Sequence, residues 1–298
     1  MLFAKLLPML LLCFIGYGLK RIKILEPEDT KTIGKLLTTL AIPAIVIKAL
    51  ATTPLNPDLL YLPLSALVVV AVLALIGTFC AQVWAWDRAT AGAFITAFPT
   101  LEGGAVGIPL MLLAFGDLGV SRFLLFDLTQ GILLFTVIYA VSTWFGKEGI
   151  PLREVILKLL RTPLVWAILV GFIFNIFNFD SPVILDFLNL VGSSFLLLIL
   201  ILLGMELQLT VSALPLHFAL TLLKAICGLG LGWLIATLFG LEGVERAAVI
   251  MGAAQPPSLV TILFAKENHL NAKLVTGFVS VAIPFSWVFL TAVLQTLQ

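Results

Sequence analysis

The sequence predicts an all-α polytopic membrane protein, with ten transmembrane helices in two inverted five-helix repeats and with breaks in the fourth and ninth helices. Three observations predict this fold: an apolar composition, long uninterrupted apolar runs, and two Gly/Pro-rich breaks at corresponding places. Of 298 residues, 61% are hydrophobic and 11% are charged, and the mean hydropathy is +1.17. Soluble domains carry roughly a quarter charged residues, so water is not the solvent for most of this chain. A net charge of +1 also argues against a nucleic-acid partner.

The length of the apolar runs predicts helices that cross a bilayer. A hydrocarbon core of about 30 Å needs about 20 apolar residues in helical form, and only helices or closed barrels satisfy the backbone in lipid. Continuous runs of this length exclude a barrel. We interpret the first run as a retained span and not as a cleaved leader. The predicted spans are residues 2–19, 33–51, 59–84, 89–114, 123–145, 163–179, 182–205, 215–239, 247–265 and 274–297.

The basic residues predict the orientation, because Lys and Arg in short loops stay cytoplasmic. Twelve of them lie near the loops that follow odd-numbered spans: Lys20, Arg21, Lys23, Lys31, Lys35, Arg88, Lys147, Arg153, Lys158, Arg161, Lys266 and Lys273. Three lie on the opposite side: Lys5, Arg122 and Arg246. Both termini are therefore expected on the non-cytoplasmic side of a cell (inner) membrane.

An odd number of spans in each half forces the second half to enter the membrane upside down, as in many transporters. The halves are residues 1–145 and 146–298. The expected breaks, 98–109 and 252–258, each lie in mid-span, and their prolines 109 and 256 are 256 − 109 = 147 residues apart. This separation is almost half the chain, as a duplicated unit would give. The alternative is that Gly and Pro merely kink these two helices.

Breaks of this kind predict a binding site. Proline removes a backbone donor and glycine allows left-handed backbone, and the groups freed in this way are tolerated at membrane depth only beside protein or a water-filled cavity. The predicted solute-binding residues are Glu102, Gly103, Gly104, Gly107, Pro109, Gln255, Pro256, Pro257 and Ser258.

Charged and polar side chains within the spans are functional candidates, because a charge at bilayer depth costs roughly 2.5 to 3.5 kcal/mol on insertion scales. Glu102 is the main candidate for contact with a solute or a coupling ion, and the alternative is a cavity-lining acid. Asp127 and Gln130 share one helical face and could serve solute or proton contact or helix pairing. Lys48 could snorkel to the headgroups or pair with an acid during gating. Lys224 lies deeper, so a buried partner such as Glu206 or Asp127 is expected, and the sequence does not decide between them.

Several motifs resemble the auxin efflux carrier family, which includes the plant PIN proteins and many short bacterial carriers. They are Gly16–Arg21 running into Leu40–Ala44, Val106–Leu110 in the first break, and Phe264–Glu267 after the second. The resemblance covers most of the chain. It implies ten helices in a scaffold domain and a transport domain, each drawn from both repeats, an elevator-type motion, and a solute held where spans four and nine cross. It also implies that the solute is an organic anion, such as auxin or a dicarboxylic acid.

One position departs from this family. Glu102 stands in the first break where the family usually places an asparagine, and Gln255 and Ser258 stand where members vary. A carboxylate repels a carboxylate solute unless it is protonated or a cation lies between them. Glu102 could instead bind a proton, sodium or the ammonium group of a zwitterionic solute.

The leading interpretation is therefore a secondary transporter of a small organic solute, most consistent with a carboxylate. The alternative within this class is a proton- or sodium-coupled carrier of an amino acid or a cationic solute. An intramembrane enzyme is disfavoured, since paired aspartates, a Ser/His pair at depth and H-E-x-x-H are missing from the sequence. A channel or non-transporting sensor remains the third class. We expect no cofactor and no metal, and a homodimer would suit such a fold.

Overall fold

The computed structural model describes residues 2–26, 28–52, 57–146, 163–179, 181–206 and 213–297. Within these ranges all regular secondary structure is helical, which confirms the predicted all-α fold class. Six helical stretches in these described ranges are long and apolar enough to cross a membrane: Asp29–Thr52, Tyr61–Val83, Gly103–Phe145, Pro182–Met205, Leu214–Leu238 and Ala272–Leu297. The shorter helix Pro163–Ile176 is also apolar. The count of ten spans stays a prediction, and Lys147, Arg153, Lys158 and Arg161 lie outside the described residues.

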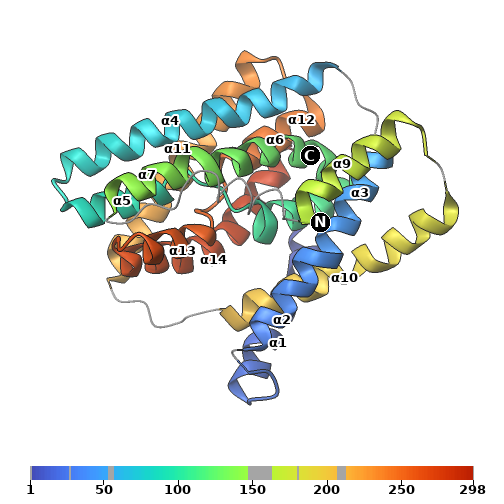
Figure 1. Ribbon diagram of the computed structural model, residues 1–298, viewed down its shortest axis with the longest axis horizontal. Helices are drawn as coiled ribbons and strands as arrows, with labels where there is room; N and C mark the ends of the chain where they lie inside the picture. Colours follow the sequence, from blue (N-terminus) through green and yellow to red (C-terminus); the bar gives the residue numbers. More distant parts are fainter. Residues whose placement is uncertain are drawn as a thin grey trace. The chain divides into compact units, whose positions relative to one another are not determined.

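The chain forms two compact units, and each takes segments from both halves of the sequence. Unit 1 contains the described parts of residues 1–55, 112–121 and 159–209. Its elements are α1 (Leu2–Arg21), α2 (Asp29–Leu36), the π-helical turn η1 (Leu37–Ala41), α3 (Ile42–Thr52), α9 (Pro163–Ile176) and α10 (Pro182–Glu206). The blue helices α1 and α3 lie beside the yellow helices α10 and α9, from the other half of the sequence (Figure 1).

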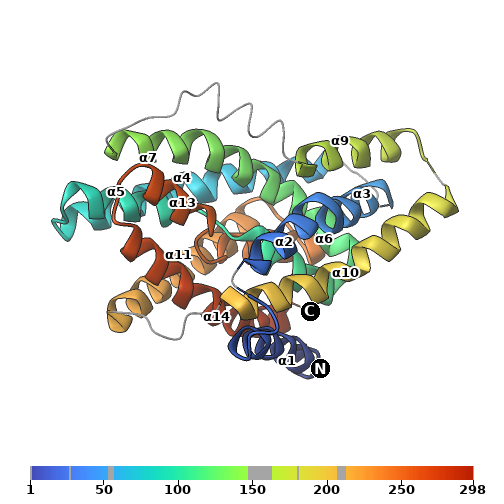
Figure 2. The same ribbon diagram turned by 60° about the horizontal axis from the view of Figure 1, so that its bottom comes forward.

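Unit 2 contains the described parts of residues 56–111, 122–158 and 210–298. Its elements are η2 (Pro57–Leu60), α4 (Tyr61–Val83), α5 (Arg88–Ala97), η3 (Gly103–Gly107), α6 (Ile108–Leu133, except 112–121), η4 (Leu134–Ile138), α7 (Tyr139–Phe145), α11 (Leu214–Leu238), α12 (Gly243–Ala253), α13 (Val260–Glu267) and α14 (Ala272–Leu297). The red helices α13 and α14 pack with α5 and α7 (Figure 2). Large buried side chains fill this unit, among them Phe94, Phe98, Phe126 and Phe278.

The stretch Gly103–Phe145 has 43 residues, which as one straight helix would measure about 65 Å and would exceed a bilayer core of about 30 Å. It is interrupted at Gly116, where φ is 62° and ψ is −149°. Only glycine adopts such a conformation readily. The interruption falls between the predicted spans 89–114 and 123–145, where the sequence predicts a loop.

The start of α5 shows how the sequence fixes a helix end. Asp87 is the N-cap residue, and its Oδ2 accepts hydrogen bonds from the backbone N–H groups of Ala89 (3.1 Å) and Thr90 (3.2 Å). Hydrogen bonds from Thr90, through its side chain and its backbone, hold the pKa of the exposed Asp87 carboxyl below its usual value. This helix leads directly into the first predicted break.

Candidate functional site

Both predicted breaks are present in unit 2. Helix α5 ends at Ala97 and helical structure resumes with η3 at Gly103, so residues 98–102 form break one. Helix α12 ends at Ala253 and α13 begins at Val260, so residues 254–259 form break two. Pro99 in the first segment, and Pro256 and Pro257 in the second, cannot donate the hydrogen bonds that would continue a helix. The polar backbone groups of both segments must therefore find other partners.

The two breaks cross and bind each other. The Glu102 backbone N–H donates to the Pro256 carbonyl at 2.9 Å. In the other direction, the Ser258 N–H donates to Thr100 Oγ1 at 3.0 Å. These contacts join residues more than 150 positions apart in the sequence, so the contact between break one and break two is a feature of the folded unit.

The Glu102 carboxylate joins the same two segments. Its Oε1 accepts a hydrogen bond from the Ala105 N–H (3.2 Å), and its Oε2 accepts from the Leu259 N–H (2.8 Å) and from Ser258 Oγ (3.3 Å). The carboxylate therefore caps η3 and the start of α13 together. Helix N-termini carry partial positive charge and unpaired N–H groups, so one acid satisfies two half-helices. The residue is buried, with 8% of its surface exposed.

The second part of α6 packs against break one. Gln130 Nε2 donates to the Leu101 carbonyl at 2.6 Å, which satisfies an acceptor that the break leaves free. The Asp127 carboxylate lies directly against Gly103, where a Cβ atom would overlap it. A Cβ atom at Gly107 would overlap the Phe123 ring in the same way. The predicted pair Asp127 and Gln130 therefore contacts break one and the turn that follows it. Two acids, Glu102 and Asp127, lie beside Gly103.

The remaining predicted residues of the breaks have distinct surroundings. Gly104 has ordinary room, since a Cβ atom there would lie 3.7 Å from Glu102 Oε1. Pro109 occupies the first turn of α6, directly after η3, and offers no backbone N–H to the helical stretch that begins at Gly103. Gln255 is fully buried, and its Nε2 donates to the Met251 carbonyl at 3.0 Å while its Oε1 has no hydrogen-bond partner.

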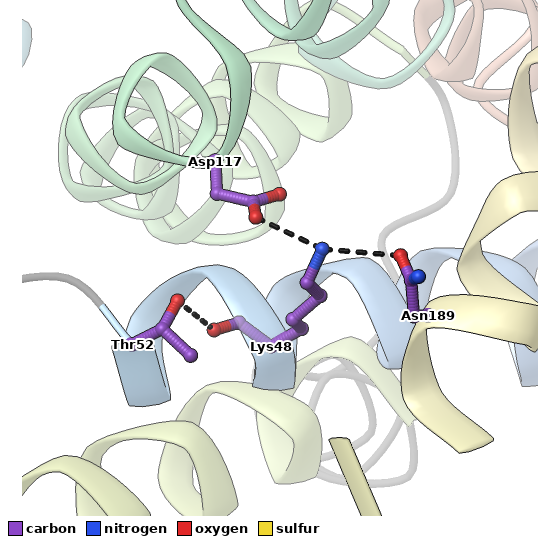
Figure 3. A network of polar contacts seen from close by, with 4 residues as sticks. All are labelled: Lys48, Thr52, Asp117 and Asn189. Atoms are coloured by element: carbon purple, nitrogen blue, oxygen red, sulfur yellow. Dashed lines mark hydrogen bonds and ion pairs between the residues drawn. The ribbon is translucent and has the colours of Figure 1, made fainter. Parts of the chain in front are cut away.

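Lys48 belongs to unit 1, whereas the residues of the two breaks belong to unit 2. Figure 3 shows its ammonium group between two partners: Asp117 Oδ2 at 2.9 Å and Asn189 Oδ1 at 3.1 Å. Asp117 directly follows the interruption at Gly116. The Lys48 and Asp117 side chains are 26% and 38% exposed. Lys48 therefore has an acidic partner, which the interpretation of Lys48 as a residue that pairs with an acid requires.

Lys224 lies in α11 of unit 2 and is 1% exposed. Its Nζ has no hydrogen-bond partner. In the part of the chain that the structure describes, it forms no ion pair either, so the structure shows no pairing with Asp127, and the Glu206 side chain lies outside that part. Its Nζ lies 5.6 Å from the centroid of the Phe98 ring, at the start of break one.

Sequence reasoning missed several residues at and near the site. Thr100 carries no charge or glycine/proline signal that marks it in the sequence, although its hydroxyl accepts the hydrogen bond that joins the two breaks. The sequence predicts that Arg122 is a loop charge, yet it is 4% exposed and its Nε donates to Glu245 Oε1 at 2.7 Å. No local signal points to this pair, because 123 residues separate its members. Among the described residues no group of three or more His, Cys, Asp or Glu side chains could hold a metal ion.

A chain of apolar helices with two interrupted helices that cross inside one unit belongs to the polytopic membrane proteins, and such a crossing is characteristic of transporters. Residues 1–149 and 150–294 match the family of membrane transport proteins. An uncharacterized transporter of Methanothermobacter thermautotrophicus is 25% identical over 293 residues, which cover 95% of this chain and 94% of that protein. The chain belongs to the membrane transport protein family, that of the auxin efflux carriers. It is a membrane transporter and not an enzyme, as the sequence predicted.

Proposed function

We propose that this protein is a secondary transporter that carries a small organic solute, with the solute bound at the crossing of the two breaks. The observation that carries the proposal is the mutual binding of the breaks through Glu102, Thr100 and Ser258. Half-helix ends that meet at membrane depth provide polar groups for a solute where a continuous helix would provide none.

The division into two compact units supports an elevator-type mechanism, in which one unit carries the solute relative to the other. Each unit is drawn from both halves of the chain, and break one and break two both lie in unit 2. We therefore propose unit 2 as the transport domain and unit 1 as the scaffold domain. Energy comes from the solute gradient or from a coupled proton or sodium ion.

The solute of the proposal is a carboxylate, as the family resemblance implies. A second candidate is a solute with an ammonium group, or a coupled cation. The proximity of two acids, Glu102 and Asp127, to Gly103 favours this candidate, because adjacent carboxylates attract positive charge. The two candidates are separated by transport assays with carboxylates, amino acids and amines at several pH values and sodium concentrations.

The test of the proposal is solute counterflow into proteoliposomes. We expect saturable uptake in the wild type and reduced uptake in Thr100→Val, because this change removes the acceptor for the Ser258 N–H while keeping the shape of the side chain. Thr38→Val is the matched control, since the Thr38 hydroxyl bonds within its own helix in unit 1. Conductance without saturation would indicate a channel, and wild-type uptake in a folded Thr100→Val protein would contradict a site at the crossing.

A further inference from the structure

The chain passes from unit 2 into unit 1 and back again within helix α6. Residues 56–111 belong to unit 2, residues 112–121 to unit 1, and the residues from 122 onward to unit 2 again. We call residues 112–121 the strap. If one unit moves relative to the other, as the proposed function requires, the chain must change direction at the strap, because both ends of the strap are covalently bonded to the moving unit.

Two polar side chains of unit 1 hold the strap through Asp117. The Lys48 ammonium group, from α3, donates to Asp117 Oδ2 at 2.9 Å and to Asn189 Oδ1, from α10, at 3.1 Å (Figure 3). One cation thereby joins the strap to helices from the first and the second half of the chain. A partly exposed ion pair of this kind is individually weak, so it can be removed without unfolding unit 1.

The backbone conformation changes at the residue directly before this anchor. Gly116 has a φ of 62° and a ψ of −149°, a conformation that only glycine adopts readily. A Cβ atom at Gly116 would meet no atom within 4 Å, so the backbone conformation requires the glycine and the packing does not. Hinge residues absorb changes of φ and ψ in this way. The part of α6 from Asp117 onward can therefore turn about its own first residue.

The first residue after the strap is fixed to unit 2. Arg122 is 4% exposed, and its Nε donates to Glu245 Oε1 at 2.7 Å. Glu245 lies in the first turn of α12, and α12 leads into break two. Removing the partner of a buried charge strongly destabilises a fold, so this contact stays closed when the unit moves. A turn of α6 about Asp117 therefore carries α12 with it.

We propose that Lys48 and Asn189 hold Asp117 as a fixed pivot on the scaffold domain, about which the second part of α6 turns when the transport domain moves. Lys48 and Asp117 are then positioning residues of the transport cycle and do not touch the solute. The inference rests on the proposed function and adds the point at which the moving domain is attached to the scaffold. A fixed pivot requires that the pair of Lys48 and Asp117 stays closed throughout the cycle.

The test replaces this ion pair by a covalent link and measures counterflow of succinate, glutamate and putrescine into proteoliposomes. The parent protein has its native cysteines replaced. In Lys48→Cys/Asp117→Cys the free thiols leave the pivot unattached. We expect the maximal uptake rate to fall by at least about threefold while the half-saturating concentration stays within about twofold, because the breaks are untouched. A short bismaleimide that links the two thiols should restore the rate to within about twofold of the parent's.

The controls are Lys48→Cys and Asp117→Cys, each treated alone with the same reagent, which should stay slow because no link forms. Uptake that is lost when the double variant is cross-linked overturns the fixed pivot, because the pair must then open in each cycle. Uptake at the parent's rate by the double variant with free thiols overturns it as well.

Gly116→Ala tests the hinge beside the pivot. Alanine resists the backbone conformation of Gly116, so the maximal uptake rate should fall by at least about threefold. Gly131→Ala is the matched control in the same helix, since a Cβ atom there also meets no atom within 4 Å. Equal uptake rates of the two variants would contradict a hinge at Gly116.

Hydrogen–deuterium exchange separates the pivot from the carrier, because it needs no solute. Lys48→Met should raise the exchange rate of the strap amides by at least about threefold through loss of the anchor. Lys35→Met, at an exposed lysine of unit 1, should leave this rate unchanged. Unchanged exchange of the strap in Lys48→Met overturns the pivot whatever the uptake. Failure of the parent protein to take up any of the three probes counts against the carrier, and the exchange measurement then decides on the pivot alone.

Discussion

At the scale of single residues, the structure gives Glu102 a structural role in addition to the binding role that its position in the sequence predicts. An acid in a glycine-rich break predicts contact with a solute or an ion. In the folded unit its carboxylate accepts hydrogen bonds from Ala105, Ser258 and Leu259, and thereby joins two half-helices. An asparagine offers one acceptor oxygen, whereas a carboxylate offers two. This chain therefore holds its breaks together by charge-assisted hydrogen bonds.

Glu102→Gln tests this use of the carboxylate. One of the two oxygens becomes an NH₂ group, which then faces a backbone N–H of Ala105 or Leu259. We expect a loss of about 1–3 kcal/mol of stability from the unsatisfied donors, a fold that remains intact, and an altered dependence of uptake on solute or ion. Thermal unfolding and counterflow measure these effects.

The control for this variant is Glu242→Gln, which changes the same chemical group at an exposed position before α12. It should leave both the apparent melting temperature and uptake unchanged. If Glu102→Gln leaves both the apparent melting temperature and uptake unchanged, the carboxylate neither stabilises the contact between the breaks nor belongs to the binding site.

At the scale of elements, unit 1 depends on close contact between α1 and α10. A Cβ atom at Gly16 would overlap the backbone of Ile201, and one at Gly204 would overlap the Cys13 carbonyl. Small residues allow membrane helices to approach in this way, and the association is then stabilised by van der Waals contact and not by the hydrophobic effect. The Gly16–Arg21 motif that carries the family resemblance therefore begins at a packing position.

Gly16→Ala should lower stability by about 1–3 kcal/mol, because the added methyl group forces the two backbones apart. Gly18→Ala is a closely matched control in the same helix, since a Cβ atom at Gly18 meets no atom within 4 Å. Apparent melting temperatures in one detergent compare the two variants. Equal melting temperatures would show that α1 and α10 do not pack through Gly16.

The two prolines of break two are redundant as helix breakers. In a continuous helix the N–H of residue 256 would bond to the carbonyl of residue 252, and that of residue 257 to the carbonyl of residue 253. Either proline alone removes one of these bonds and clashes with the preceding turn. We expect Pro256→Ala to retain the break and most of the uptake, and Pro256→Ala/Pro257→Ala to lose saturable uptake while still folding. Wild-type uptake by the double variant would contradict a functional role of the break.

At this scale, a feature can be predicted from the sequence when the residues that cause it are close together in the chain. The breaks were predictable because proline and glycine act on their own backbone, and Gly116 likewise marks the predicted loop. The pairs Lys48 with Asp117 and Arg122 with Glu245 were not predictable as pairs, because they depend on how distant helices pack. The packing also decides that Lys224 faces Phe98 and not an acid.

At the scale of the whole molecule, the internal duplication stays a prediction. The family matches the chain in two segments, 1–149 and 150–294, whose junction lies beside the predicted boundary of the halves at residue 145. Helix α4 in the first half and α11 in the second both lead through a short loop into a broken helix, α5 and α12 respectively. If the halves are inverted, these two loops face opposite sides of the membrane.

Paired cysteine labelling tests the inversion and the orientation together. In a protein whose native Cys13, Cys80 and Cys227 are replaced, Glu242→Cys should react with a membrane-impermeant maleimide on intact cells, because the loop after α11 is predicted to lie outside. Ala85→Cys, in the loop after α4, should react only after permeabilisation. Both residues are exposed, so a missing reaction reports the side of the membrane and not burial. Labelling of both from one side would contradict an inverted repeat, whereas exchanged reactivities would keep the repeat and reverse the orientation that the basic residues predict.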